Sequence, residues 1–484
     1  MLSALILIPL IGSALVGLIP DREGKSSRNV AMFLAISVIV INCYIGLNFD
    51  TGISGFQFAE DIPWVEWLGL NYSLGIDGLS FPLICLNSLL TAIAVFVTDR
   101  KIDRPRFYYA MLLLLSAGAA GAFLAKDLLL FFLFYEIEIV PLYFLLAIWG
   151  GKRRGYAAMK FLLYTAFSGI LVLASFLGLV WLSGANTFAY ETLRSHNLPL
   201  TSQLLLIAPL IVGVFIKIPI FPFHTWLPDA HVEASTPISV LLAGVLLKLG
   251  TYALLRFGLG LYLRAWAEIA PWMAILAGIS ALYGASCAIS QKDMKKVVAY
   301  SSIAHMAYIL LGASATTRLS VTACVFQMVS HGLISALLFL LVGVVYKKTG
   351  KRDVDSLRGL LNPEKGLPVT GGLMILGVMA SSGLPGMVGF ISEFLIFRGS
   401  FPIYPIPTLL CLVGTGLTAV YFLLVINKVF FGRLTDALAE IPPVKWVEHT
   451  PAFALLFLII TFGIQPAWVI QWSEIQATAL LTGG

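Results

Sequence analysis

Apolar residues fill runs of about 20 that recur along the whole chain, with short polar segments between them. Runs of that length cross a hydrocarbon core of roughly 30 Å as α-helices. No stretch keeps up the apolar–polar alternation of a β-barrel strand. The pattern therefore predicts an all-α, polytopic membrane protein. Its helices, about fourteen, are expected near residues 2–20, 29–48, 77–97, 107–124, 127–149, 157–182, 203–223, 234–257, 267–290, 295–313, 319–346, 368–397, 407–431 and 450–472.

Basic residues gather on alternate loops between these spans. They are Arg22, Lys25, Arg28; Arg100, Lys101, Arg104, Arg106; Lys152, Arg153, Arg154; Lys292, Lys295, Lys296; Lys347, Lys348, Lys351, Arg352, Arg358; Lys428 and Arg433. The loop over 50–77, by contrast, contains no lysine or arginine. The positive-inside rule then predicts that both termini lie on the outer or lumenal side. Segment 2–19 lacks the basic n-region of a signal peptide and is counted as the first span.

Composition excludes several functions for the chain by itself. Of its 484 residues 59% are hydrophobic and 12% are charged, and the mean hydropathy is +0.92, so water is not the solvent for most of it. Its five cysteines are scattered within apolar runs, without the clustered spacing of iron–sulfur or zinc sites. The segment Gly24-Lys25-Ser26 lacks the upstream glycine of a phosphate-binding loop. We expect no cofactor or metal in this chain and no nucleic-acid partner.

Two of the predicted spans contain helix breakers. Lys217-Ile-Pro-Ile-Phe-Pro222 interrupts the seventh, and Gly383-Leu-Pro-Gly386 interrupts the twelfth. Broken helices at matching places in two halves indicate an ion path, because the freed carbonyls must line a wet cavity or pack against protein. The loop charges give the two halves opposite topology. We therefore predict N-terminal helices in 1–106, two inverted five-helix repeats in 107–258 and 267–432, and a C-terminal helix in 450–484.

Ionisable residues lie inside several spans. A charge at mid-membrane costs about 2.5–3.5 kcal/mol or more, so each requires a partner or water. The candidates are Glu136, Lys217, Lys248 and Glu393. Glu138 lies two residues after Glu136, and on a regular helix the two side chains point about 200° apart. Only one of them is then expected to face the interior. These charges act either as proton-transfer groups or as ion pairs that fix helix packing.

Histidines in the tenth and eleventh spans add groups that exchange protons near neutral pH. His305 and His331 are interpreted as links in a proton wire. The alternatives are hydrogen-bonded packing residues and a bis-histidine haem site. The segment from His224 to Glu233 is predicted to be a polar loop, acting as a proton entrance or a structured turn.

Several long motifs resemble the NdhD/NuoM family, the ND-four-type subunits of complex I. They are Phe221-Pro-Phe-His-Thr-Trp-Leu-Pro-Asp-Ala-His231, Leu241 to Lys248, Gln327-Met-Val-Ser-His331-Gly, Gly383-Leu-Pro-Gly386, Phe390-Ile-Ser-Glu393-Phe and Ile76-Asp77-Gly-Leu-Ser80. The resemblance covers nearly the whole chain. It implies fourteen helices, inverted repeats and a central row of protonatable residues. Matched by motif, the row is Glu136, Lys217, Lys248, His305, His331 and Glu393, whereas Glu138 replaces the usual apolar residue.

The resemblance also implies a mechanism and partners. Quinone reduction elsewhere in a complex would perturb a Glu136–Lys217 pair, and the proton would pass through Lys248 and the histidines to Glu393. Quinone and iron–sulfur clusters would belong to other subunits of an NAD(P)H/ferredoxin:quinone oxidoreductase, with which this chain would form the membrane arm.

The loops look closest to the photosynthetic type, which implies plastoquinone, ferredoxin and a thylakoid membrane, or otherwise a bacterial inner membrane. The segment His231-Val-Glu233-Ala-Ser-Thr favours the variant that serves carbon-dioxide uptake. The alternative class is the D-type subunit of a multi-subunit Na⁺/H⁺ antiporter, which usually carries lysine at the position of Glu393.

Overall fold

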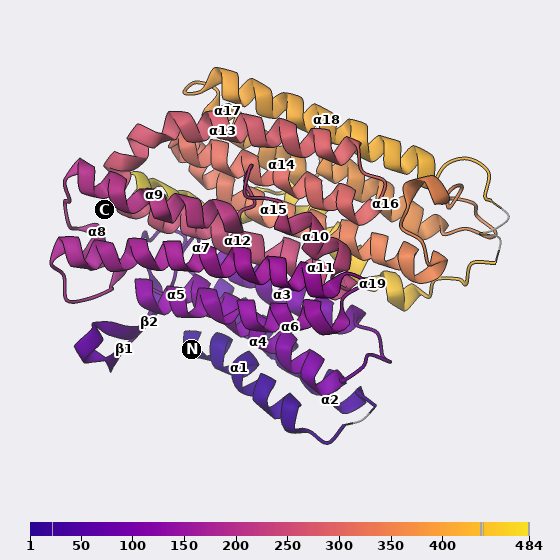
Figure 1. Cartoon of the computed structure of the whole chain (residues 1–484), viewed down its shortest axis with the longest axis horizontal. Coiled ribbons are helices and arrows are strands. Elements are labelled where there is room, and N and C mark those ends of the chain that lie inside the picture. Colours follow the sequence, from indigo (N-terminus) through magenta and orange to yellow (C-terminus); the bar gives the residue numbers. More distant parts are fainter. Residues whose placement is uncertain (22, 436–437, 439, 483–484) are drawn as a thin grey trace.

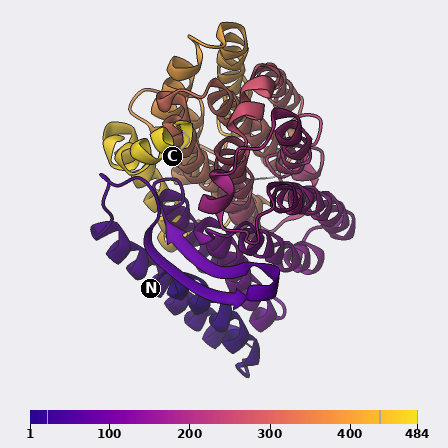
Figure 2. The same cartoon turned by 90° about the vertical axis from the view of Figure 1, so that its left-hand side faces the viewer.

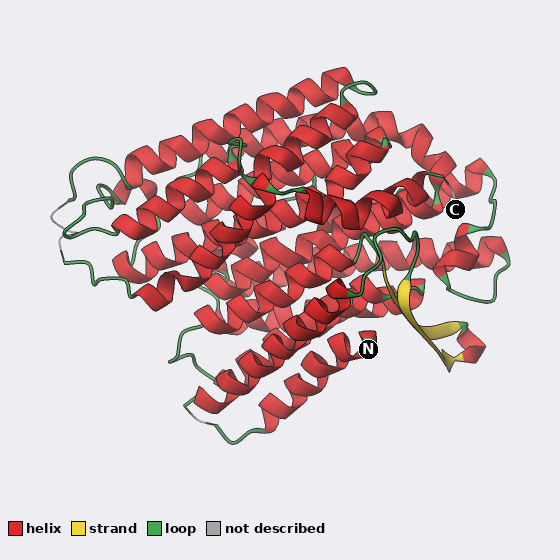
Figure 3. Cartoon of the chain, turned by 180° about the vertical axis from the view of Figure 1, so that it is seen from behind, coloured by secondary structure: helices red, strands yellow, loops and turns green. Residues whose placement is uncertain are grey.

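Long, roughly parallel helices form one bundle, and both termini lie at the same end of it (Figures 1 and 3). A computed structural model describes residues 1–21, 23–435, 438 and 440–482. Eleven helices among these residues are long and apolar enough to cross a membrane. Three shorter apolar helices, α1, α3 and α16, take the remaining predicted positions. The expected polytopic helical architecture is confirmed.

The bounds of the elements follow the predicted spans closely. Those of the first half are α1 (Leu2–Leu18), α2 (Lys25–Leu47), β1 (Gln57–Val65), β2 (Leu70–Ile76), α3 (Phe81–Val97), α4 (Pro105–Leu124), α5 (Leu128–Ile137), α6 (Ile139–Trp149), α7 (Arg154–Ser183), α8 (Tyr190–Arg194), α9 (Leu200–Lys217), α10 (Trp226–Glu233), α11 (Thr236–Leu241), η2 (Leu242–Leu246), α12 (Leu247–Ala253) and η3 (Leu254–Leu259). Those of the second half are α13 (Leu263–Ile289), α14 (Met294–Ala315), α15 (Arg318–Thr349), α16 (Pro368–Ser381), α17 (Val388–Ser400), α18 (Pro405–Val429), α19 (Trp446–Ile464) and α20 (Ala467–Leu481). Short 3₁₀ turns η1 (Glu66–Leu68) and η4 (Val354–Ser356) complete the set.

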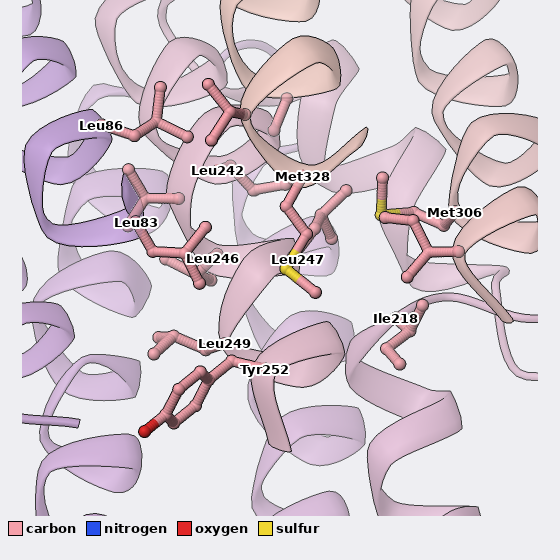
Figure 4. Close-up of a cluster of buried hydrophobic side chains, with 14 of the residues drawn as sticks. Leu83, Leu86, Ile218, Leu242, Leu246, Leu247, Leu249, Tyr252, Met306 and Met328 are labelled. Atoms are coloured by element: carbon pink, nitrogen blue, oxygen red, sulfur yellow. The ribbon is translucent and has the colours of Figure 1, made fainter. Parts of the chain in front are cut away.

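The continuous helix from α11 to η3 is the centre of the bundle. No residue from Pro237 to Gly260 is exposed. Leu242, Leu246 and Leu247 of this helix pack among leucines of α3 and methionines of α14 and α15 (Figure 4). A helix that is apolar all round is stable only where other helices cover every face. The central helix therefore holds its one ionisable group near the middle, Lys248, away from lipid.

The two predicted helix breaks are present. Helix α9 ends at Lys217, just before Pro219 and Pro222, and the chain resumes as α10. Helix α16 ends at Ser381, and α17 begins at Val388 after a turn in which Gly383 has φ +72° and Gly386 has φ +91°. Left-handed backbone of this kind favours glycine, which explains the residue type at both positions.

Three local predictions are wrong. The loop over 50–77 contains an antiparallel hairpin, β1–β2, that lies across the end of the bundle near the termini (Figure 2). Residues 226–233, expected to be a loop, form the buried helix α10. The last predicted span is two helices, because Pro466, which has no N–H to continue α19, starts α20.

Two aspartates occupy matching places in the predicted repeats. Asp127 caps α5 by accepting hydrogen bonds from Leu129 N (2.9 Å) and Leu130 N (3.0 Å), and Asp293 caps α14 in the same way. Each aspartate also forms an isolated antiparallel bridge, to Ala189 and to Asp353 respectively. Inverted repeats would produce this correspondence at opposite ends of the bundle. The repeat boundaries themselves remain a prediction.

A buried ion pair joins the hairpin end of the bundle to the central helix. Arg256 of η3 pairs with Asp77, which also accepts hydrogen bonds from Leu79 N (3.0 Å) and Ser80 N (3.1 Å) at the start of α3. The guanidinium further contacts the ring of Phe56, 4.9 Å from its centroid. The pair thus fixes α3, η3 and the segment before β1 together.

We predict that Arg256→Gln destabilises the protein by about 3–5 kcal/mol, because the Asp77 carboxylate stays buried without its partner. Thermal unfolding of the detergent-solubilised protein measures the loss. The double variant Asp77→Asn, Arg256→Gln removes both charges and should lose less than the single variant. A double variant that is less stable than Arg256→Gln alone would contradict this account of the ion pair.

Candidate functional site

Among the described residues, the buried ionisable side chains include six on or beside the helices that carry the predicted row. They are Glu138 (0% exposed), Lys217 (1%), Lys248 (0%), His305 (5%), His331 (5%) and Glu393 (4%). Buried charges without partners cost far more than the few kcal/mol that hold a protein folded. The contacts of each group therefore determine what it can do.

Lys217 pairs with Glu138, not with Glu136 as expected. The reason is local. Glu138, between α5 and α6, keeps helical backbone dihedrals (φ −67°, ψ −23°). It therefore faces the opposite side of this span from Glu136, and that side holds Lys217. The Lys217 ammonium also lies 3.9 Å from the ring centroid of Tyr135, a cation–π contact. Tyr135 of α5 and Glu138 just after it thus hold the lysine at the break after α9.

Glu136 occupies a different position. Its side chain is half-buried, and its carboxyl lies so close to Gly169 of α7 that a Cβ there would overlap with it. Glycine at 169 is therefore what allows the carboxylate to fit between α5 and α7. The two glutamates do face different surroundings, as their spacing predicts, and the structure places Glu138 against the lysine.

Lys217 lies close to the central helix without bonding to Lys248. A Cβ on Gly250 of α12 would meet Lys217 Cβ at 3.1 Å, which shows how tightly the end of α9 packs there. Within the described part of the chain, no hydrogen bond joins the two lysines. The buried groups therefore form two clusters: the Glu138–Lys217 pair, and a second cluster that begins at Lys248.

Lys248 lies between two π-helical segments, η2 and η3. Its ammonium donates to the carbonyl oxygen of Ala243 (2.6 Å) and contacts Nδ1 of His331 (2.7 Å). A π-helical turn shifts the carbonyls out of the regular ladder and occurs often at functional sites. Here it supplies an oxygen that solvates an otherwise dry ammonium.

His331, His305 and Glu393 continue from Lys248. The rings of His331 and His305 are 5.7 Å apart between centroids. Nδ1 of His305 is 3.6 Å from Oε1 of Glu393, and its Nε2 is 3.2 Å from Oγ of Ser381. Thr415 donates to the other Glu393 oxygen at 3.1 Å. The break between α16 and α17 brings Ser381 and Glu393 to the same histidine.

A cavity of about 10 Å³ adjoins these groups, and Gln327 and Ser330 line it with both histidines and Glu393. That volume is about what one water needs. Within the described residues, Gln327 Oε1 and Ser330 Oγ have no hydrogen-bond partner. A water in this cavity would connect the two histidines. The same small volume leaves no room for a haem macrocycle between them.

Two further ionisable groups are buried outside the predicted row. Lys295 was counted with a basic loop, but it is buried and donates to the carbonyl oxygen of Ala234 (2.6 Å). His231 of α10 is buried and stacks on Phe339, with 4.4 Å between ring centroids. His231 belongs to the segment that the sequence analysis interpreted as a proton entrance or a structured turn. Among the described residues, no group of three or more His, Cys, Asp or Glu could hold a metal ion.

The fold and the buried row of protonatable groups define the class: an antiporter-like membrane protein. A family model described as "NADH:quinone oxidoreductase/Mrp antiporter, TM" matches residues 125–418, and the chain belongs to that family. The matched region includes the Glu138–Lys217 pair and the whole second cluster, from Lys248 to Glu393.

Proteins from cyanobacteria are similar along nearly the full length. "NAD(P)H-quinone oxidoreductase chain 4 1" from Nostoc sp. is 41% identical, over 97% of this chain and 89% of its own. "NAD(P)H-quinone oxidoreductase chain 4-2" from Synechocystis sp. is 40% identical, over 91% and 79%. Both carry the name of an oxidoreductase subunit, which agrees with the NdhD/NuoM resemblance.

Solved structures share the architecture. A chain of respiratory complex I from Thermus thermophilus has a TM-score of 0.90 at 29% identity, with 100% of both chains covered. A chain of the Mrp complex from Dietzia sp. has a TM-score of 0.89 at 19% identity, with 99% of this chain and 97% of that chain covered. The similarity to the Mrp chain, at 19% identity, shows a shared fold alone.

We predict that Lys248→Met leaves the midpoint of thermal unfolding unchanged or raises it. Methionine keeps most of the side-chain volume, and replacing a buried charge by an apolar group is often neutral or stabilising. Lys248→Ala is the matched control, and it should lower the midpoint because it leaves a cavity. If Lys248→Met lowered the midpoint as much as Lys248→Ala does, the ammonium would be a structural group.

Proposed function

We propose that this chain is a proton-translocating membrane-arm subunit of an NAD(P)H-quinone oxidoreductase of the NDH-1 type. The observation that carries the proposal is the row of contacts from Lys248 through His331 and His305 to Glu393. Groups at these distances exchange protons directly or through one water. No substrate bond is broken in this chain, and the redox chemistry belongs to other subunits.

In the proposed relay, Glu138 holds the proton on Lys217 while the ion pair is intact. Weakening of that pair, by a change in a neighbouring subunit, releases the proton toward Lys248. Burial disfavours the charged form of each group, and an opposite charge restores it, so arrival of one charge favours departure of the next. His331 and His305 then pass the proton to Glu393, which gives it up at the far end.

We assign Glu136 to the same relay, although it does not pair with Lys217 as the sequence analysis expected. Its carboxyl lies between α5 and α7 and is half-buried, so it is open to the influence of whatever packs against this side of the bundle. We propose that Glu136 responds to the neighbouring subunit and shifts the Glu138–Lys217 pair by like-charge repulsion across α5.

Within the NDH-1 type, we assign the complex of this chain to the photosynthetic variant. It is supported by cyanobacterial relatives that are 40–41% identical. On this proposal the protein resides in a thylakoid or bacterial inner membrane with both termini on the lumenal or outer side, and its complex uses plastoquinone and ferredoxin. The segment His231-Val-Glu233-Ala-Ser-Thr supports a role in carbon-dioxide uptake. Other membrane-arm subunits are its direct partners.

The alternative is a D-type subunit of a Na⁺/H⁺ antiporter, which the shared fold favours. The discriminating feature is the end of the relay. Glu393 accepts from Thr415 and lies next to His305, so the relay ends in a carboxylate, where the antiporter subunits usually carry lysine. The carboxylate therefore supports the oxidoreductase subunit.

We predict that Glu138→Gln reduces proton translocation roughly tenfold or more, since it removes the partner of Lys217 and acid–base groups typically contribute 10²–10⁴-fold. Glu136→Gln should have a smaller effect, because the ion pair stays intact. Vesicles that contain the assembled complex and a pH-sensitive dye measure translocation per quinone reduced. If Glu136→Gln reduced translocation as much as Glu138→Gln or more, Glu138 would not be the functional partner of Lys217.

Lys217→Ala and Glu393→Ala should each abolish most translocation while the complex still assembles. Translocation at the wild-type level in both variants refutes the relay. The same vesicles separate the two function classes: a sodium gradient should drive no proton flux in the absence of quinone. Sodium-driven flux that is lost in Lys217→Ala would favour the antiporter.

A further inference from the structure

A large cavity opens at the end of the bundle where the basic loops gather. Its volume is about 850 Å³, within the range of roughly 300–1,000 Å³ that is typical of ligand pockets. It lies between the C-terminal ends of α3 and α15 and the N-terminal ends of α2, α11 and α19. None of the residues assigned to the relay lines it.

The inner wall of the cavity is apolar. Phe96 and Val97 line it from α3, and Leu340, Leu341 and Val344 line it from α15. Phe96 and Val97 end the apolar helix α3, and residues 340–344 lie one to three turns before the end of α15, which is long and apolar enough to cross a membrane. A polypeptide segment in that position would have to satisfy its backbone N–H and C=O groups against apolar side chains, whereas a hydrocarbon chain carries no such groups.

The mouth of the cavity is cationic. Six basic side chains line it against two acidic ones; the basic residues are Arg28, Arg100, Lys101, Lys347, Lys348 and Lys445, and the acidic residues are Asp99 and Glu448.

The acidic side chains are already engaged. Glu448 pairs with Lys347 (3.2 Å) and Lys348 (2.9 Å), and Asp99 lies 3.9 Å from Lys347. Arg100 and Lys101 have no acidic partner among the residues described. Both are exposed at the rim. An excess of positive charge thus remains at the mouth of the cavity.

We propose that this cavity binds an anionic phospholipid, with the headgroup phosphate at Arg100, Lys101 and Lys445 and an acyl chain along α3 and α15. Charge complementarity at the mouth selects the anionic headgroup, and the apolar wall selects the chain. The lipid would join the N-terminal helices to α11, the start of the central helix. Thr236 of α11 lines the cavity and packs against Gly343 of α15.

The experiment uses the intact complex in nanodiscs that contain a trace of phosphatidylglycerol with a photoreactive diazirine on its acyl chain. Labelled peptides of this chain are identified by mass spectrometry, and phosphatidylcholine with the same chain is the comparison lipid. The expected result is labelling of 340–344 and 447–452 by the anionic lipid, several-fold above the zwitterionic one. Inorganic phosphate at millimolar concentration should not reduce it, which distinguishes a lipid from a site for free phosphate.

The test variant is Arg100→Gln with Lys101→Gln. Each basic residue near a membrane surface contributes about 1 kcal/mol to binding of anionic lipid, so the double variant should reduce labelling about tenfold or more. The matched control is Lys152→Gln with Lys365→Gln, which removes the same charge from exposed sites outside the cavity. The control should label as the wild type does.

Equal labelling by both lipids, or undiminished labelling in the double variant, would overturn the proposal. Labelling of neighbouring polypeptides in place of residues 340–344 and 447–452 would do the same. A thermal unfolding midpoint equal to that of the wild type shows that the double variant is folded. None of these measurements depends on proton translocation, so the lipid site and the relay can fail separately.

Discussion

The cost of burying charge governs the arrangement of this protein. A charge in the middle of a bundle such as this must find either an opposite charge or hydrogen-bonding oxygens, because the surrounding leucines and phenylalanines solvate neither. Lys217 has Glu138 and the face of Tyr135. Lys248 has a backbone carbonyl and a histidine nitrogen. Each buried cation thus remains in place because of a particular neighbour, and moving that neighbour changes the free energy of the proton it carries.

Irregular backbone supplies two neighbours of the second cluster. The turn after α16 brings Ser381 to His305. The π-helical segments on both sides of α12 place the carbonyl of Ala243 next to Lys248. In a membrane, such departures persist only where protein or water satisfies the freed groups. The breaks and the buried charges therefore stabilise each other, and neither is easily explained alone.

Much of this could be predicted from the sequence, for physical reasons that also set the limit. Hydropathy located the spans, because crossing a bilayer demands length and apolarity. Prolines and glycines marked the breaks after Lys217 and before Glu393, because their backbone restrictions are local. Glu138 was missed as the partner because Glu136 was chosen by motif, as the glutamate five residues before Pro141. The π-helical turns around Lys248 leave no signal in the sequence, since tertiary packing imposes them.

The separation of the two clusters has a consequence for any relay built on them. From Lys248 to Glu393, successive groups lie within a hydrogen bond or one water of each other, so protons would equilibrate along this part freely. If Lys217 were joined to it as closely, the path would conduct in both directions and dissipate the gradient it builds. The absence of a bond between the lysines, in the described residues, leaves one step that requires the Glu138–Lys217 pair to change. In such a relay, control of direction would consist of holding or releasing one ion pair, and the close packing of the end of α9 against Gly250 would keep Lys217 beside the central helix.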